Sequence, residues 1–117
     1  MSAKSQRLGR IEGEMQRVLS TLVSREVRDP RVGMVTLTSV DVAPDLSHAK
    51  VFFTLLNTEQ KDKTVRALQR AAGFLRSQLS HRMNMYSTPA LRFVYDESVE
   101  RGDRLSRLID SVVPPKT

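Results

Sequence analysis

The spacing of apolar side chains predicts a long amphipathic helix near the start of the chain, from about Gln6 to Arg25. Apolar residues recur there at steps of three and four, which places them on one side of a helix with about 3.6 residues per turn. This stripe consists of Leu8, Ile11, Met15, Val18 and Leu22. The other positions are mostly polar or charged, so the helix has one side for a core and another for solvent or a partner.

A strand over residues 34–42 follows, and its apolar pattern predicts a β-bulge. The segment Asp29-Pro30-Arg31-Val32-Gly33 ends the helix, because proline lacks a donor and glycine frees the turn. The strand is rich in Val and Thr, and its apolar alternation changes phase between Leu37 and Val40. One extra residue near Thr38–Ser39 restores the phase, so the apolar side chains of both halves can face the core.

A second strand, from His48 to Leu56, alternates in a single phase. Its apolar face consists of Ala49, Val51, Phe53 and Leu55. The short turn Ala43-Pro44-Asp45-Leu46-Ser47 joins the two strands, which favours an antiparallel hairpin.

The longest predicted helix runs from about Lys61 to Met83 and has a core side and a basic side. The core stripe consists of Val65, Leu68, Ala72, Leu75, Leu79 and Met83. The opposite stripe, which contains no acid, consists of Lys63, Arg66, Arg70, Gly73, Ser77 and His81. A glycine inside a helix costs about 1 kcal/mol relative to alanine. We therefore expect a break at Gly73, either a kink or backbone left bare for a ligand; the alternative is a glycine kept for packing.

A third strand and a last helix complete the predicted order. Thr88-Pro89 ends the long helix, and Leu91, Phe93 and Tyr95 then alternate as a strand. A short helix over about residues 98–112 follows. The order is helix, strand, strand, broken helix, strand, short helix. It predicts a single α+β domain over residues 1–117, in which a three-stranded sheet carries its helices on one face.

The charge of the chain is concentrated in one stretch. The formal net charge is +6, and residues 63–95 contain six basic residues and no acid, while the rest of the chain has 13 of each sign. Fourteen of the 19 basic residues are arginines, which hold phosphate in a bidentate fork and stack on bases. A focused excess of this kind points to a polyanion partner, although a solvated basic helix face gives the same pattern.

Candidate residues for other chemistry are few. There is no cysteine, and the two histidines, His48 and His81, are expected on the surface rather than as paired metal ligands. The acid pairs Asp41/Asp45 and Asp96/Glu97 stand beside predicted turns, where carboxylates usually cap the backbone. No glycine-rich phosphate loop is present, and the longest apolar run is far too short to cross a bilayer. We expect a cytoplasmic monomer with no catalytic centre, metal, cofactor, small-molecule substrate or membrane partner.

Four motifs resemble those of the bacterial ribosome-binding factor A family, in the same order and over nearly the whole chain. The first two are Asp29-Pro30-Arg31-Val32-Gly33-Met34 and Asp45-Leu46 followed by Ala49-Lys50-Val51. The third is Ala71-Ala72-Gly73-Phe74-Leu75-Arg76, similar to the family's Ala-x-Gly signature. The fourth is Tyr95-Asp96 with Ser98, Gly102 and Leu108.

The resemblance implies a type II KH-like fold in which the Ala-x-Gly kink stands in for a Gly-x-x-Gly loop. It also implies a factor that binds the free small (30S) ribosomal subunit. Such a factor assists late maturation of 16S rRNA, including its 5′ end, and is most important in the cold.

We interpret the chain as an rRNA-binding assembly factor. The residues expected to contact RNA are Lys63, Arg66, Arg70, Ala71, Gly73, Arg76 and Arg82, with Arg10 and Arg17 as a second edge. Arg10 and Arg17 could equally pair with neighbouring acids of their own helix. Tyr86 is the best candidate for a base contact, and covering the edge of the core is the alternative. A general single-stranded nucleic-acid-binding module and a scaffold for acidic proteins are the other function classes.

Overall fold

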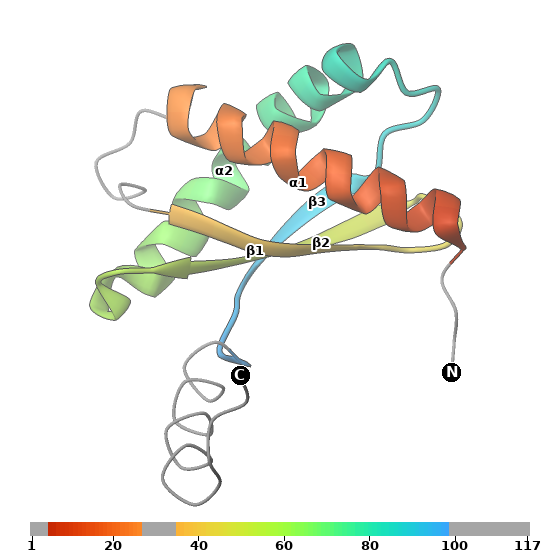
Figure 1. Cartoon of the computed structure of the whole chain (residues 1–117). Coiled ribbons are helices and arrows are strands. Elements are labelled where there is room, and N and C mark those ends of the chain that lie inside the picture. The colour runs from red at the N-terminus through yellow and green to blue at the C-terminus, as the bar shows by residue number, and fades with distance from the viewer. Residues whose placement is uncertain (1–4, 27–34, 99–117) are drawn as a thin grey trace, which may run out of the picture.

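The computed structural model describes residues 5–26 and 35–98, which form two long helices and three strands. In chain order these are α1 (Gln6–Glu26), β1 (Val35–Val42), β2 (His48–Leu55), the single 3₁₀ turn η1 (Thr58–Gln60), α2 (Lys61–Met83) and β3 (Ala90–Tyr95) (Figure 1). The predicted turn over residues 29–33 and all but the first residue of the predicted helix over 98–112 lie outside the described residues.

The sheet is mixed, with strand order β1-β2-β3. β1 and β2 pair as the predicted antiparallel hairpin, and their register shifts between Leu37 and Ser39. The predicted bulge is therefore confirmed: Leu37, Val40 and Val42 are all buried, on both sides of the irregularity. β3 lies parallel to β2, with His48 opposite Ala90 and Phe53 opposite Tyr95.

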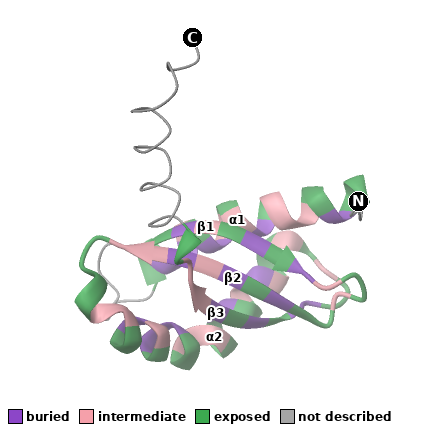
Figure 2. Cartoon of the chain, turned by 90° about the horizontal axis from the view of Figure 1, so that it is seen from below, coloured by how far each residue is buried: buried purple, intermediate pink, exposed green. Residues whose placement is uncertain are grey.

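Both helices cover the same face of the sheet, and within residues 5–26 and 35–98 no element covers the other face, which we call the open face (Figures 1 and 2). The core lies between the two layers. Its largest fully buried apolar side chains are Phe53, Met15, Leu19, Leu22, Leu68, Leu75, Leu79, Val42 and Val51. Burial of apolar area of this kind is the main driving force for folding. The two-layer α+β architecture is as predicted.

The long helix α2 is continuous, so the kink expected at Gly73 as one form of the break is wrong. Lys61–Met83 is one α-helix, and Gly73 does not adopt a positive φ. The glycine's unfavourable propensity, about 1 kcal/mol, is outweighed by packing on either side of it. Leu68 and Leu75 are both fully buried and hold the two halves of the helix on the sheet. The helix ends instead at Asn84, in the left-handed conformation at φ 52°, whose N–H bonds the Ser80 carbonyl.

Side chains from the helices cap both outer edges of the sheet. On β3, the Gln69 amide nitrogen donates to the Leu91 carbonyl at 3.0 Å, and its oxygen accepts from the Phe93 N–H at 3.1 Å. On β1, Gln16 donates to the Leu37 carbonyl at 3.2 Å and a Glu12 oxygen accepts from the Val42 N–H at 2.8 Å. Because these backbone groups would otherwise be free to pair with another strand, the caps protect both edges.

Candidate nucleic-acid interface

The predicted basic stripe of α2 lies on the outer side of the helix. All six of its residues are exposed: Lys63, Arg66, Arg70, Gly73, Ser77 and His81. Leu68, Leu75 and Leu79, on the opposite side, are fully buried and fix the rotation of the helix. The stripe is therefore presented to solvent by the same packing that builds the core.

Because α2 is continuous, Arg76 and Arg82 lie outside this stripe, on other sides of the helix. Each residue turns about 100° around the axis, so both lie about 120° away from Arg70. Arg82 is exposed in the last turn. Arg76 is exposed but bound to the chain itself, because Nε and Nη2 donate to the Thr88 carbonyl at 3.0 and 2.8 Å. A kink would have been needed to bring all five cations onto one side.

Gly73 leaves bare backbone in the middle of the stripe. A Cβ built on it would meet nothing within 4 Å, so this surface is open to a partner. Ala71, the other small residue of the predicted site, is half-buried and packs against the core. The alanine therefore supports the helix from inside, while the glycine faces out.

Phe74, next to Gly73, is an exposed aromatic that the sequence interpretation missed. Its relative exposure is 48%, although an apolar residue in a helix is usually taken as core. The signal that could have found it is its position six residues after Leu68, which places it about 120° away from that core residue around the axis. Phe74 thus adds an apolar surface beside the basic stripe.

Arg10 and Arg17 extend the exposed basic surface onto α1. Both are exposed, and they lie seven residues apart, so they project from nearly the same line along the helix. Since α1 and α2 cover the same face of the sheet, their outer sides form one surface of the molecule (Figure 1). We call this surface, with Arg10, Arg17, Lys63, Arg66 and Arg70, the helical face.

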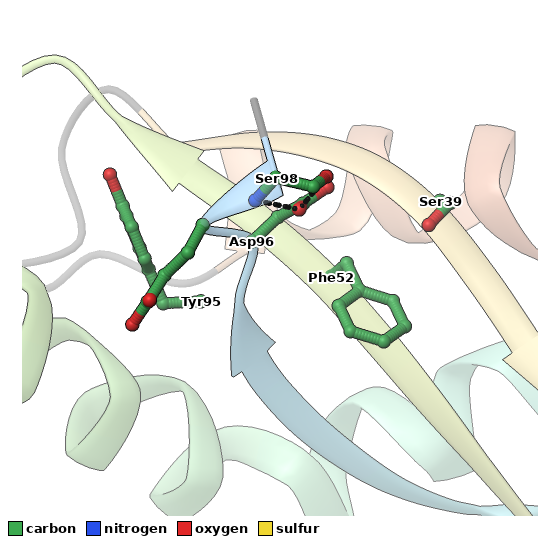
Figure 3. A pocket seen from close by; sticks show the side chains of 6 residues that line it. Ser39, Phe52, Tyr95, Asp96 and Ser98 are labelled. Carbon is green, nitrogen blue, oxygen red and sulfur yellow. Dashed lines mark hydrogen bonds between the residues drawn. The ribbon is translucent and has the colours of Figure 1, made fainter. Parts of the chain in front are cut away.

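The open face of the sheet carries acids near the end of β3. A pocket of about 410 Å³ there is lined by Ser39, Phe52, Tyr95, Asp96, Glu97 and Ser98 (Figure 3). Thr38, at the bulge, donates to Asp96 Oδ2 at 2.7 Å, and the Ser98 N–H donates to Asp96 Oδ1 at 2.9 Å. Lys61 lies 3.8 Å from a Glu97 oxygen. Asp96 thus fastens the end of β3 to the bulge, and Glu97 pairs with Lys61 at the start of α2. Carboxylates repel phosphate, so this end of the open face is not the candidate interface.

Asp45, another polar residue considered in the sequence analysis, has a structural role in the β1–β2 turn. Asp45 forms the predicted turn-type contacts, accepting from the Ser47 N–H at 3.0 Å and from its hydroxyl at 2.7 Å, and these hydrogen bonds lower the pKa of Asp45.

His48 and His81 are both exposed, on different elements. Among the described residues, no group of three or more histidine, aspartate or glutamate side chains could hold a metal ion. No helix in the same part of the chain is long and apolar enough to cross a membrane.

A family model decides the relationship that the motifs suggested. The model described as ribosome-binding factor A matches residues 7–109. The chain belongs to the ribosome-binding factor A family. Ribosome-binding factor A of Dechloromonas aromatica is 50% identical to it over 105 residues, covering 90% of this chain and 85% of the relative. The same factor of Pseudomonas syringae pv. tomato is 49% identical over 116 residues, covering 97% and 84%.

Solved structures confirm the KH-like fold of the ribosome-binding factor A family. The crystal structure of ribosome-binding factor A from Thermus thermophilus superimposes with a TM-score of 0.68 at 28% identity, covering 74% of this chain and 93% of that one. A putative ribosome-binding factor A from Thermotoga maritima, solved by NMR, gives a TM-score of 0.69 at 31% identity, covering 80% and 91%. A homology model of the Thermus factor, fitted into a cryo-EM map of a 30S–RbfA complex, gives 0.65 at 27% identity, covering 75% and 93%.

Proposed function

We propose that this protein is a ribosome assembly factor that binds the free small (30S) subunit through its helical face. In this role it assists late maturation of 16S rRNA, including its 5′ end, and is most important in the cold. The observation that carries the proposal is the exposed stripe of α2, which is basic and without acids in a chain of the ribosome-binding factor A family. The fitted Thermus relative in a 30S complex supports the choice of partner.

The helical face suits the backbone of folded RNA better than a particular base sequence. Arginine and lysine contacts to phosphates supply affinity and orientation but carry no sequence information by themselves. Lys63, Arg66 and Arg70 lie within two turns of α2, so they can meet phosphates of one strand. Gly73 follows in the same stripe, where bare backbone permits close approach of sugar and phosphate.

Binding of this kind assists maturation through the shape of the RNA. A protein that binds one conformation better than another shifts the population toward it, by as much as its differential affinity. The factor then holds the precursor of 16S rRNA in the conformation that it binds best, while separate enzymes process the rRNA ends. The protein itself supplies no reaction, and it acts as a cytoplasmic monomer.

Sedimentation of a cell lysate tests the proposal. The protein is expected to travel with free small subunits and to be nearly absent from translating ribosomes. A strain without the gene is expected to accumulate 16S rRNA with an unprocessed 5′ end, more strongly at low temperature. Protein that stays at the top of the gradient even at low salt would contradict the ribosomal role and favour a general single-stranded nucleic-acid-binding module.

A further inference from the structure

A hollow of about 490 Å³ lies at one end of the helical layer, where α2 ends. Three segments build it: the first turns of α1, the β1–β2 turn, and the end of α2 with the loop that follows. Its apolar lining includes Leu46, Met83 and Met85. We call it the end hollow.

Tyr86 stands at the end hollow with its side chain entirely in solvent. Its relative exposure is 106%, so it does not cover the edge of the core, and that alternative is wrong. The loop that carries it is nevertheless held on both sides. The Met85 N–H bonds the Ser80 carbonyl at 3.3 Å before Tyr86, and Arg76 makes its two bonds to the Thr88 carbonyl after it. A ring that adds nothing to the core is therefore presented on a loop fixed in place.

Cations stand around the same hollow. Arg7 and Arg10, both exposed, line it from the first turns of α1. Glu14, one turn further along, is the acid of the lining. Guanidinium groups beside an exposed aromatic ring and an apolar surface are the combination that single-stranded nucleic acid requires, because phosphates need positive charge and bases need a ring to stack on.

We propose that the end hollow receives one unpaired nucleobase of RNA, which stacks on Tyr86 while Arg7 and Arg10 hold its phosphates. This inference rests on the proposed function and adds a base contact to an interface otherwise made of phosphate contacts. Met83 and Met85 offer polarizable apolar contact to the base. The Glu14 carboxylate can accept a hydrogen bond from a base amino group and repels phosphate, so it orients the nucleotide with its base inward.

The base must be unpaired because both faces of a paired base are already stacked within a helix. Proteins read RNA sequence mainly at loops, bulges and ends, where bases can be splayed out onto aromatic side chains. The end hollow is therefore expected to select single-stranded RNA over duplex RNA of the same sequence.

The test uses a tryptophan placed in a chain that has none. In the full-length protein, Tyr86→Trp keeps a stacking ring, and its fluorescence reports directly on the end hollow. We expect quenching on addition of oligoadenylate and little change with the same strand annealed to oligouridylate. Equal quenching by strand and duplex, or none by either, would overturn the inference.

The second part of the test measures the affinity of the variants for purified small subunits. Tyr86→Leu should weaken it about 5- to 150-fold, since stacking on one base is worth roughly 1–3 kcal/mol. Tyr86→Phe should restore affinity to within about twofold. Leu56→Ser is the matched control, because Leu56 is another exposed apolar residue, with a relative exposure of 86%, beyond the opposite end of β2. All variants should unfold at the wild-type temperature.

The outcomes separate this inference from the proposed function. If wild type binds subunits and Tyr86→Leu binds equally well, the end hollow holds no base and the proposed function stands. If Tyr86→Leu loses affinity for subunits but its affinity for free oligoadenylate equals wild type, a ribosomal protein occupies the hollow and the inference is overturned. If wild type binds oligoadenylate through Tyr86 but never binds subunits, the base site stands and the ribosomal role fails.

Discussion

Replacing Gly73 by alanine should stabilise the protein and weaken its binding to small subunits. Gly73 lies inside a continuous helix without positive φ, and an added Cβ meets nothing within 4 Å. Alanine should therefore gain the helix-propensity difference of about 1 kcal/mol, which raises the melting temperature by about 4 °C for a domain of this size. The same substitution should weaken binding only if a partner lies against the bare backbone at Gly73.

The loss in binding follows from the same methyl group. If sugar and phosphate lie in contact with Gly73, the methyl forces them apart, and overpacking of that kind costs about 1–3 kcal/mol. The affinity for small subunits should fall by roughly 5- to 150-fold while the free protein becomes more stable. Thermal unfolding and a binding titration on purified subunits, made with the same preparation, measure the two effects.

Gly9→Ala is the matched control. Gly9 is an exposed glycine of α1 whose Cβ would also meet nothing within 4 Å, so alanine should stabilise there as well and leave binding unchanged. Gly73→Ala that binds like wild type would show that RNA does not approach this glycine. Gly73→Ala that melts at a lower temperature would contradict the continuous helix.

Three further predictions follow from single contacts. Arg66→Glu with Arg70→Glu should lower RNA affinity and reduce the slope of log affinity against log salt by about one per lost phosphate contact; an unchanged slope would mean a merely solvated stripe. Gln69→Ala should destabilise by about 1–3 kcal/mol in urea unfolding, because it removes both bonds to β3, whereas Gln6→Ala, at an exposed position, should be nearly neutral. Since hydrogen bonds from Ser47 lower the pKa of Asp45 from its ordinary value of 3.8, its contribution to stability is full above that value and is lost as pH falls through the folded pKa. Asp45→Asn should therefore reduce the acid sensitivity of unfolding below about pH 4, and an unchanged acid limb would contradict this role.

Local patterns in the sequence were sufficient for most of the fold. The phase change between Leu37 and Val40 predicted the bulge, because side-chain alternation in a strand has a period of two and any slip must be absorbed. Helical periodicity likewise predicted the outward basic stripe and most of the core sides of α1 and α2. In α1, however, Ile11 and Val18 are only partly buried, and the buried Leu19 and Val23 lay outside the predicted stripe.

The parts that could not be predicted depend on contacts between distant residues. Parallel pairing of β3 with β2 and the capping of β3 by Gln69 join segments more than 20 residues apart, and neither leaves a local pattern. The break expected at Gly73 relied on the low helix propensity of glycine and on the kink implied by the family resemblance. Packing of Leu68 and Leu75 outweighs that propensity, and the helix stays continuous. Arg76 was expected to face RNA, but its bonds to the Thr88 carbonyl depend on where the chain turns back after α2. Charge in the sequence identified the basic surface, and the fold decides which cations share it.

Directed cleavage of rRNA from a probe attached to the protein tests the central claim most directly. The chain has no cysteine, so Ser77→Cys and Ser39→Cys each provide one site for an iron chelate that generates hydroxyl radicals. Ser77 is exposed in the basic stripe of α2, and Ser39 is exposed at the acid-lined pocket of the opposite face. If the helical face binds the small subunit, the probe at Ser77 should cut 16S rRNA strongly at a few clustered positions and the probe at Ser39 only weakly. Strong cutting from Ser39 with little from Ser77 would place the RNA on the open face of the sheet and contradict the account.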